Sequence, residues 1–97
     1  MIIVTGSVTA RPETFEALRQ ASLDHVLRSR TEPGCISHSV QVDCENPLRL
    51  FFFERWEDMA ALRTHFIQPG SIAFIAAVRD LAAASESISM YEASPAG

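Results

Sequence analysis

Three consecutive phenylalanines near the middle of the chain limit what it can fold into. The segment Leu48–Trp56 is rich in large apolar side chains and follows a turn-forming stretch, so it predicts a β-strand. Because successive side chains of a strand point to opposite faces, Phe52 lies on one face and Phe51 and Phe53 lie on the other. An exposed ring forfeits roughly 2–3 kcal/mol of burial free energy. Both faces of the sheet that holds this strand therefore need a cover.

The rest of the chain predicts a small α+β domain around this strand. Sequence patterns predict further strands and helices: strands at residues 2–9, 35–42 and 87–92, and helices from Pro12 to about Thr31, after Asp58, and over residues 72–84. The breaker pair Pro69-Gly70 separates the last two helices. The order β-α-β-β-α-β is typical of the ferredoxin-like fold, in which helices cover one face of an antiparallel four-stranded sheet.

Alternation assigns one face of strand 35–42 to a set of mostly apolar residues, namely Ile36, His38, Val40 and Val42. Residues 43–47 predict a turn that joins this strand to Leu48–Trp56 as an antiparallel hairpin. The helix over residues 72–84 carries only two charged residues, Arg79 and Asp80, and is predicted to be buried on more than one side.

The sheet face away from the helices predicts a second copy of the chain as its cover. The chain has 97 residues, which form one domain over residues 1–97 with a modest core, yet 47% of them are hydrophobic. This surplus of apolar surface predicts a homodimer. Residues 93–97 are small and rich in helix and strand breakers, and are predicted to fray.

The charged residues argue against nucleic acid or a membrane as partner. The eight basic residues are all arginine, scattered from Arg11 to Arg79, and the net charge is −4. Binding to nucleic acid needs a basic stripe, which is missing here. No apolar run, Leu50–Phe53 included, is nearly long enough to cross a bilayer, and no export signal is visible. With Cys35 and Cys44 as free thiols, the sequence predicts a cytoplasmic protein.

No motif predicts a cofactor or a metal. The chain has neither a glycine-rich dinucleotide fingerprint nor a phosphate-binding loop. Its histidines, His25, His38 and His65, fall on three different predicted elements, and no spacing fixes a coordination geometry. We therefore expect a site without a metal ion or an organic cofactor.

Several short motifs follow one another at distances typical of a known family. They are Glu32-Pro33-Gly34-Cys35-Ile36, Val40, Asp43, Asn46-Pro47, Phe53-Glu54-Arg55-Trp56-Glu57-Asp58, Ala61-Leu62 and His65-Phe66. With them the chain resembles the antibiotic biosynthesis monooxygenase (ABM) family, which includes quinol monooxygenases, over residues 2–92. The resemblance implies a dimeric α+β barrel with a pocket between the sheet and the helices of each subunit. It implies the fold more firmly than a reaction, because some members oxygenate phenols or quinols without cofactors and others degrade haem.

The sequence departs from both of these family patterns. The phenol-oxygenating branch has an amide four positions before the tryptophan and a tyrosine six positions after it, where this chain has Phe52 and Leu62. The haem-degrading branch has an asparagine on the first strand and a tryptophan where His65 stands here. Haem degradation is therefore disfavoured, and the proton relay of the first branch is incomplete.

The leading hypothesis is a cofactor-independent monooxygenase-type enzyme that uses O₂ on a small aromatic or quinol-like compound. Such chemistry needs a base, a donor for the developing oxyanion and a dry pocket. His65 is the best base or donor because imidazole titrates near neutral pH. Trp56 can stack on a flat substrate and donate its indole N–H. The other predicted pocket residues are His38, Phe52, Glu54, Phe66, Ile67 and Phe74.

Each of these residues also has a purely structural interpretation. His65 can bond to strand backbone, Trp56 can anchor the core, and Glu54 can form an ion pair between strands or between subunits. Two other functions stay open. One is a non-oxidative isomerase of a small hydroxyketone, which needs only His65 and a carboxylate. The other is a non-catalytic dimeric module that binds a small apolar ligand.

Overall fold

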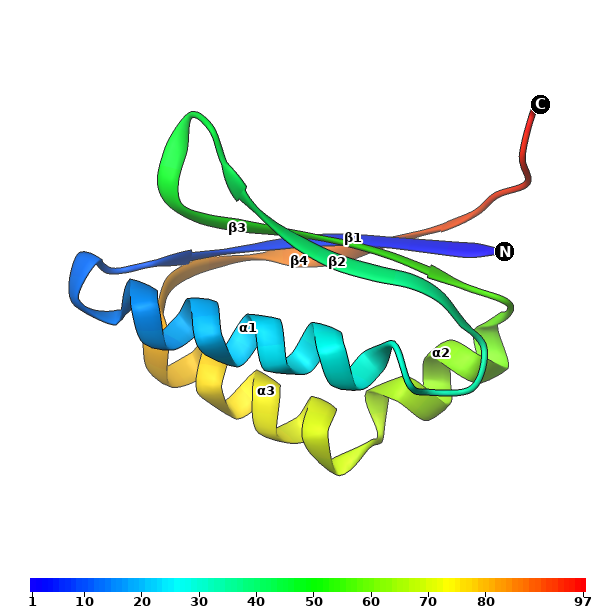
Figure 1. Cartoon of the computed structure of the whole chain (residues 1–97), viewed down its shortest axis with the longest axis horizontal. Coiled ribbons are helices and arrows are strands. Elements are labelled where there is room, and N and C mark those ends of the chain that lie inside the picture. The colour runs from blue at the N-terminus through cyan, green and yellow to red at the C-terminus, as the bar shows by residue number, and fades with distance from the viewer.

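The computed structural model describes all 97 residues and shows helices packed on one face of a single sheet (Figure 1). The strands are β1 (Ile2–Ala10), β2 (Cys35–Asp43), β3 (Asn46–Trp56) and β4 (Ala82–Glu92). The helices are α1 (Phe15–Ser29), which follows a short 3-10 turn at Pro12–Thr14, α2 (Met59–Phe66) and α3 (Pro69–Leu81). The strand order is β2-β3-β1-β4, and all neighbours are antiparallel. This is the predicted ferredoxin-like fold.

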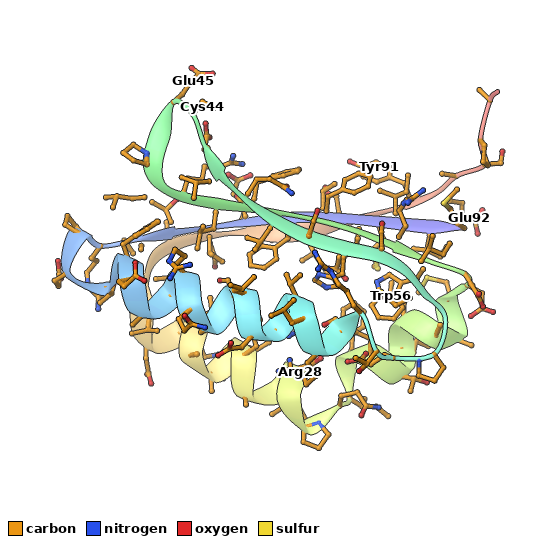
Figure 2. All side chains as sticks on the ribbon, in the orientation of Figure 1. Arg28, Cys44, Glu45, Trp56, Tyr91 and Glu92 are labelled. Atoms are coloured by element: carbon orange, nitrogen blue, oxygen red, sulfur yellow. The ribbon has the colours of Figure 1, made fainter.

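The β2–β3 hairpin is tighter than predicted. The turn contains only Cys44 and Glu45, at the tip seen in Figure 2, and β3 already begins at Asn46. Asp43 Oδ1 accepts from the backbone N–H of Glu45 at 2.8 Å, and Asn46 Oδ1 accepts from that of Leu48 at 3.1 Å. These side chains accept hydrogen bonds from backbone N–H groups around the turn, so the pairing of β2 with β3 continues to Asp43 and Asn46.

The boundary between α3 and β4 also differs from the prediction. The helix covers residues 69–81 rather than 72–84, because Pro69 does not break it but occupies its first turn, where a missing N–H costs nothing. The strand begins at Ala82 rather than Ser87, and Ala82 pairs with Ala10 of β1. Residues 82–86 have no marked periodicity, so pairing with β1 decides their structure.

The prediction that Ile36 shares a face of β2 with His38 is wrong. Cys35 pairs with Trp56 and Ser37 pairs with Arg55, so Ile36 is an extra, bulged residue. Ile36 is 44% exposed, and Cys35 packs against the core in its place. His38 is fully buried on the inner face of the sheet.

The core lies between the helices and the inner face of the sheet. The alternation predicted for β3 is confirmed, because Leu50, Phe52, Glu54 and Trp56 are all buried there. One apolar cluster lies near one end of the sheet and is formed by Val8, Ala10, Leu18, Val26, Leu50 and Phe52. A second contains Ile2, Val4, Trp56 and Leu62. Asp58 caps α2, which follows it as predicted, since its side chain accepts from the N–H of Ala61 at 2.8 Å.

Helix α3 is less buried than its composition suggests. It packs mainly on α1, and Ile72 and Ile75 are 61% and 51% exposed, so the prediction of burial on several sides fails for the single chain. Ile88 and Met90 of β4 are also about half exposed. None of the helices is long and apolar enough to cross a membrane.

Candidate functional site

A cavity of about 310 Å³ lies between α3 and the β1–β4 half of the sheet. This volume is at the small end of the range for ligand pockets. Three aromatic rings line it, those of Phe52, Phe66 and Phe74. Its polar residues are Ser7, His25, Glu54, His65 and Ser71, which are buried, and Arg79, Ser85 and Glu86, which lie on exposed parts of the wall.

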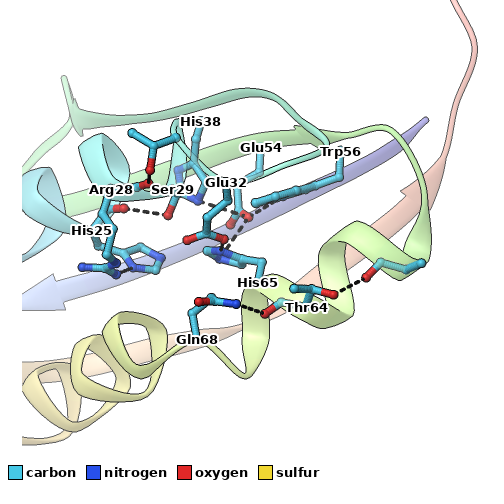
Figure 3. Close-up of polar contacts among 12 residues, drawn as sticks. His25, Arg28, Ser29, Glu32, His38, Glu54, Trp56, Thr64, His65 and Gln68 are labelled. Carbon is cyan, nitrogen blue, oxygen red and sulfur yellow. Dashed lines mark hydrogen bonds and ion pairs between the residues drawn. The ribbon is translucent and has the colours of Figure 1, made fainter.

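His65 is held at the cavity by a carboxylate from a distant part of the chain. It lies in the last turn of α2, and its Nδ1 is 2.7 Å from Oε1 of Glu32, in the turn after α1 (Figure 3). A carboxylate only accepts hydrogen bonds, so Nδ1 carries a proton, and in the neutral ring the lone pair then lies on Nε2. The Nε2 atom lies 3.9 Å from Oε1 of Glu54. This pairing makes Nε2 the ring nitrogen of His65 that can take up a proton beside the cavity.

Glu54 is a buried negative charge next to that base. Its Oε1 accepts from the indole Nε1–H of Trp56 at 2.9 Å and lies 3.2 Å from Nε2 of His38. Burial raises the pKa of Glu54, but the contacts with His38 and Trp56 outweigh burial and hold the pKa below its ordinary value. Glu54 is therefore ionised at neutral pH.

Three of the predicted site residues do not line the cavity. Trp56 and His38 are fully buried behind Glu54, and the indole N–H of Trp56 is used by that carboxylate. The Trp56 ring also packs on His65, with 4.6 Å between ring centroids. Ile67 follows α2 and is 71% exposed, away from the cavity walls. Phe52, Glu54, His65, Phe66 and Phe74 do line the cavity, and their part in substrate binding stays a prediction.

His25 is a cavity residue that the sequence did not single out. It lies on the buried side of α1 and stacks on Phe74, with 4.2 Å between centroids and 9° between planes. Burial, followed by the nearby His38 and His65, lowers its pKa to about 3. The only sequence signal is a polar residue at helical spacing among Leu18, Ser22 and Val26, on the face that packs inward.

The fold brings the three histidines together, which their sequence positions did not predict. One nitrogen from each of His25, His38 and His65 lies within 4.8 Å of the other two. However, Nδ1 of His25 faces the guanidinium of Arg28, which only donates hydrogen bonds. Nδ1 must then accept, the proton lies on Nε2, and His25 has no lone pair left for a metal. The hydrogen bonding does not fit three-histidine coordination.

Comparison with known proteins decides the family. The sequence profile described as "Antibiotic biosynthesis monooxygenase" matches residues 1–77. The chain belongs to the antibiotic biosynthesis monooxygenase family. The crystal structure of a candidate ABM protein from Deinococcus radiodurans is 31% identical, with a TM-score of 0.93, over 99% of this chain and 95% of that chain. Membership of the ABM family supports a monooxygenase-like or small-ligand-binding function.

Two other relatives extend the comparison. An uncharacterised protein from Synechocystis is 35% identical over 91 residues, which are 94% of this chain but 62% of that protein. The ABM chain therefore spans less than two thirds of that relative. A structure from Mycobacterium tuberculosis, 24% identical, has the same fold with a TM-score of 0.89, over 99% of this chain and 98% of that chain.

Proposed function

We propose that this ABM protein is a cofactor-independent monooxygenase of small, flat hydroxylated arenes such as naphthoquinols. The observation that carries the proposal is the Glu32–His65 pair, 2.7 Å apart, at the wall of a cavity lined with aromatic rings. Glu32 fixes the tautomer of His65, so that Nε2 is the base. Glu54, 3.9 Å away, stabilises the imidazolium that forms when His65 takes a proton.

The reaction needs only a base, O₂ and a dry pocket. His65 removes a hydroxyl proton from the quinol, and the resulting anion gives an electron to O₂. The two radicals combine to form a carbon–oxygen bond at a neighbouring ring carbon, and the peroxide takes up a proton. The hydroperoxide then loses water: its O–O bond breaks, the ring carbon gives up its hydrogen, and a new carbonyl forms at that carbon. Naphthoquinol and O₂ thus yield hydroxynaphthoquinone and water, with one oxygen atom in each product.

Oxygen uptake tests the proposal. Chelator-treated wild-type protein is mixed with 1,4-naphthoquinol in an oxygen electrode, beside His65→Gln, Glu32→Gln and the control Thr64→Ala. Thr64 is exposed on the same helix and lies outside the cavity wall. We expect His65→Gln to lose at least about 100-fold in rate, as for loss of a general base, and Thr64→Ala to match the wild type. Wild-type uptake no faster than the spontaneous reaction would refute the proposal.

The same site geometry suits proton transfer without oxygen. Glu54 and His65 both line the cavity, and two such groups can move a proton within a small hydroxyketone. Isomerisation that continues under strict anaerobiosis would therefore replace the oxygenase by an isomerase. Tight binding of aromatic compounds with no conversion would leave a ligand-binding module.

We infer that the working unit is a homodimer in the cytoplasm. The sheet face away from the helices carries Ile3, Phe51 and Phe53, and Tyr91 extends this face on β4, 56% exposed (Figure 2). A second copy presents the same apolar face, so two sheets can pack on each other with matching chemistry. Cys35 and Cys44 are free thiols, which suits a reducing compartment.

A further inference from the structure

We propose that His25 is a fixed, neutral hydrogen-bond donor that binds the same substrate oxygen from which His65 takes a proton. The inference rests on the proposed function of the cavity and deepens it. It assigns the site an oxyanion-binding group, which the sequence motifs of the chain do not supply. It also defines the substrate class as flat compounds with an ionisable phenolic or enolic hydroxyl.

The tautomer of His25 follows from its neighbour. The guanidinium of Arg28, one turn further along α1, faces Nδ1 of His25 (Figure 3). Arginine stays protonated and has no acceptor atom, so Nδ1 must be the accepting nitrogen. A neutral His25 then carries its proton on Nε2. His65 has the opposite arrangement, because Glu32 takes its Nδ1–H.

The Nε2–H of His25 is available to a ligand. The structure gives it no hydrogen-bonding partner within the chain, and it is not among the fully enclosed polar atoms that lack one. Both nitrogens of His38, in contrast, are enclosed. His25 also lines the cavity and is held face to face against Phe74. The strong fall in its pKa supports a ring that stays neutral at every physiological pH.

The spacing of the two rings allows one oxygen atom to contact both. The centroids of His25 and His65 are 5.2 Å apart, and one nitrogen of each lies within 4.8 Å of the other. A hydrogen bond spans about 2.8 Å, so an oxygen placed between the two rings lies within hydrogen-bonding distance of one nitrogen of each ring. When His65 removes the proton of a bound hydroxyl, His25 is already oriented toward the oxyanion that forms, which is how preorganised donors stabilise such charges.

Arg28 is a positioning residue in this arrangement. It forms no ion pair with a carboxylate within the chain, and its Nε is buried without a partner, so its main polar contact is His25. Gly70, in the first turn of α3, makes room for it, because a Cβ at Gly70 would collide with the guanidinium. Gly70→Ala therefore displaces Arg28 without changing any cavity residue.

Tautomers can be read directly by nitrogen NMR of the imidazole rings. In the wild type we expect His25 with its proton on Nε2 and His65 with its proton on Nδ1. In Arg28→Gln and Gly70→Ala, the His25 signal is expected to shift toward a mixture of tautomers, while His65 keeps its state. A wild-type His25 protonated on Nδ1, or charged at neutral pH, would overturn the proposal.

Ligand binding tests the donor separately from turnover. The probe is the anion of 2-hydroxy-1,4-naphthoquinone, followed by the fluorescence of Trp56, the single tryptophan. We expect His25→Leu to weaken binding about 10- to 100-fold, as for loss of a hydrogen bond to a charged group, and His25→Gln to retain most of it. Naphthalene, which has no oxygen, should bind the wild type and His25→Leu equally.

The outcomes separate the two proposals. One result is that the wild type consumes no oxygen while His25→Leu binds the hydroxynaphthoquinone anion more weakly than the wild type does. That result refutes the monooxygenase function and supports the donor role of His25. If His65→Gln abolishes turnover while His25→Leu leaves binding and turnover unchanged, the donor fails and the oxygenase stands. Stoichiometric Zn²⁺ binding that needs His25 would also overturn the donor, because a ligating Nε2 cannot carry a proton.

Discussion

Three histidines share one region of this fold, and their neighbours give them three different states. Glu32 accepts from His65 and leaves it a basic Nε2, whereas Arg28 donates to His25 and leaves it an N–H donor. His38 is enclosed beside Glu54 and reaches no ligand. For His25 and His65, the partner of Nδ1 therefore sets which ring nitrogen faces the cavity as donor or acceptor.

The buried state of His25 predicts a dependence of stability on pH. The pKa of His25 is about 3 in the folded chain against 6.5 for an unperturbed histidine, so between these values the unfolded chain binds the extra proton. The contribution of neutral His25 to the free energy of unfolding is complete above pH 6.5. It is lost as the pH falls toward 3, by up to about 1.4 kcal/mol per pH unit. Urea unfolding at pH 6.5 and 5.0 should show this fall.

His25→Gln is the matched variant for this measurement, because it removes the titrating group and keeps a polar side chain. Its free energy of unfolding should change less over the same interval. Glu54 acts in the same direction, since its pKa is lowered from 4.5, but its effect lies at lower pH. Equal slopes for wild type and His25→Gln would contradict the assigned state of His25.

The turn between α1 and β2 is the element that joins Glu32 to His65. Gly34 in this turn has φ of 84°, a backbone conformation that side chains disfavour. Its carbonyl accepts from the N–H of Glu57 at 2.8 Å, and a Cβ on Gly34 would lie 2.5 Å from that of Ala61. A side chain at this position would therefore push α2, and with it His65, away from the turn.

Gly34→Ala should destabilise the chain by about 1–3 kcal/mol, through strain at positive φ and the collision with Ala61. Gly6→Ala is the control, because Gly6 has ordinary φ and its Cβ would meet the Ile88 side chain at 3.2 Å. Urea unfolding of both variants measures the difference. Equal stabilities would show that the turn does not need its glycine.

Local sequence patterns predict the elements better than the site. The alternation in β3 and the breakers around each helix depend on neighbouring residues, and they give the correct order of elements. The bulge at Ile36 and the early start of β4 depend on pairing with other strands, which no local pattern reports. His65 was predicted as a base, but Glu32 and His25 reach it only because the fold brings α1 and the turn after it beside the end of α2.

At the scale of the whole molecule, the sheet face away from the helices has no cover in the single chain, although it carries large apolar side chains. Phe51 and Phe53 are only half-buried there, and Arg49 lies over Phe51, 5.7 Å from its centroid. These rings keep part of their burial free energy unrealised in the monomer. The proposed dimer would recover it.

Phe53→Glu should convert the dimer into a monomer, because a carboxylate at the centre of the interface would be desolvated without a partner. Sedimentation velocity measures the mass, and Ala17→Glu, which adds the same charge at an exposed position of α1 on the opposite side of the sheet, is the control. A wild-type chain that sediments as a monomer at micromolar concentration would contradict the dimer.

The measurement that tests the central claim most directly is isotope labelling with ¹⁸O₂. Metal-free wild-type protein and 1,4-naphthoquinol should give hydroxynaphthoquinone with one ¹⁸O atom, and the second ¹⁸O should appear in water. With His65→Gln, only the spontaneous reaction should remain, which yields unlabelled naphthoquinone and hydrogen peroxide. An unlabelled product from the wild type, or equal labelling with His65→Gln, would contradict the role of the Glu32–His65 pair.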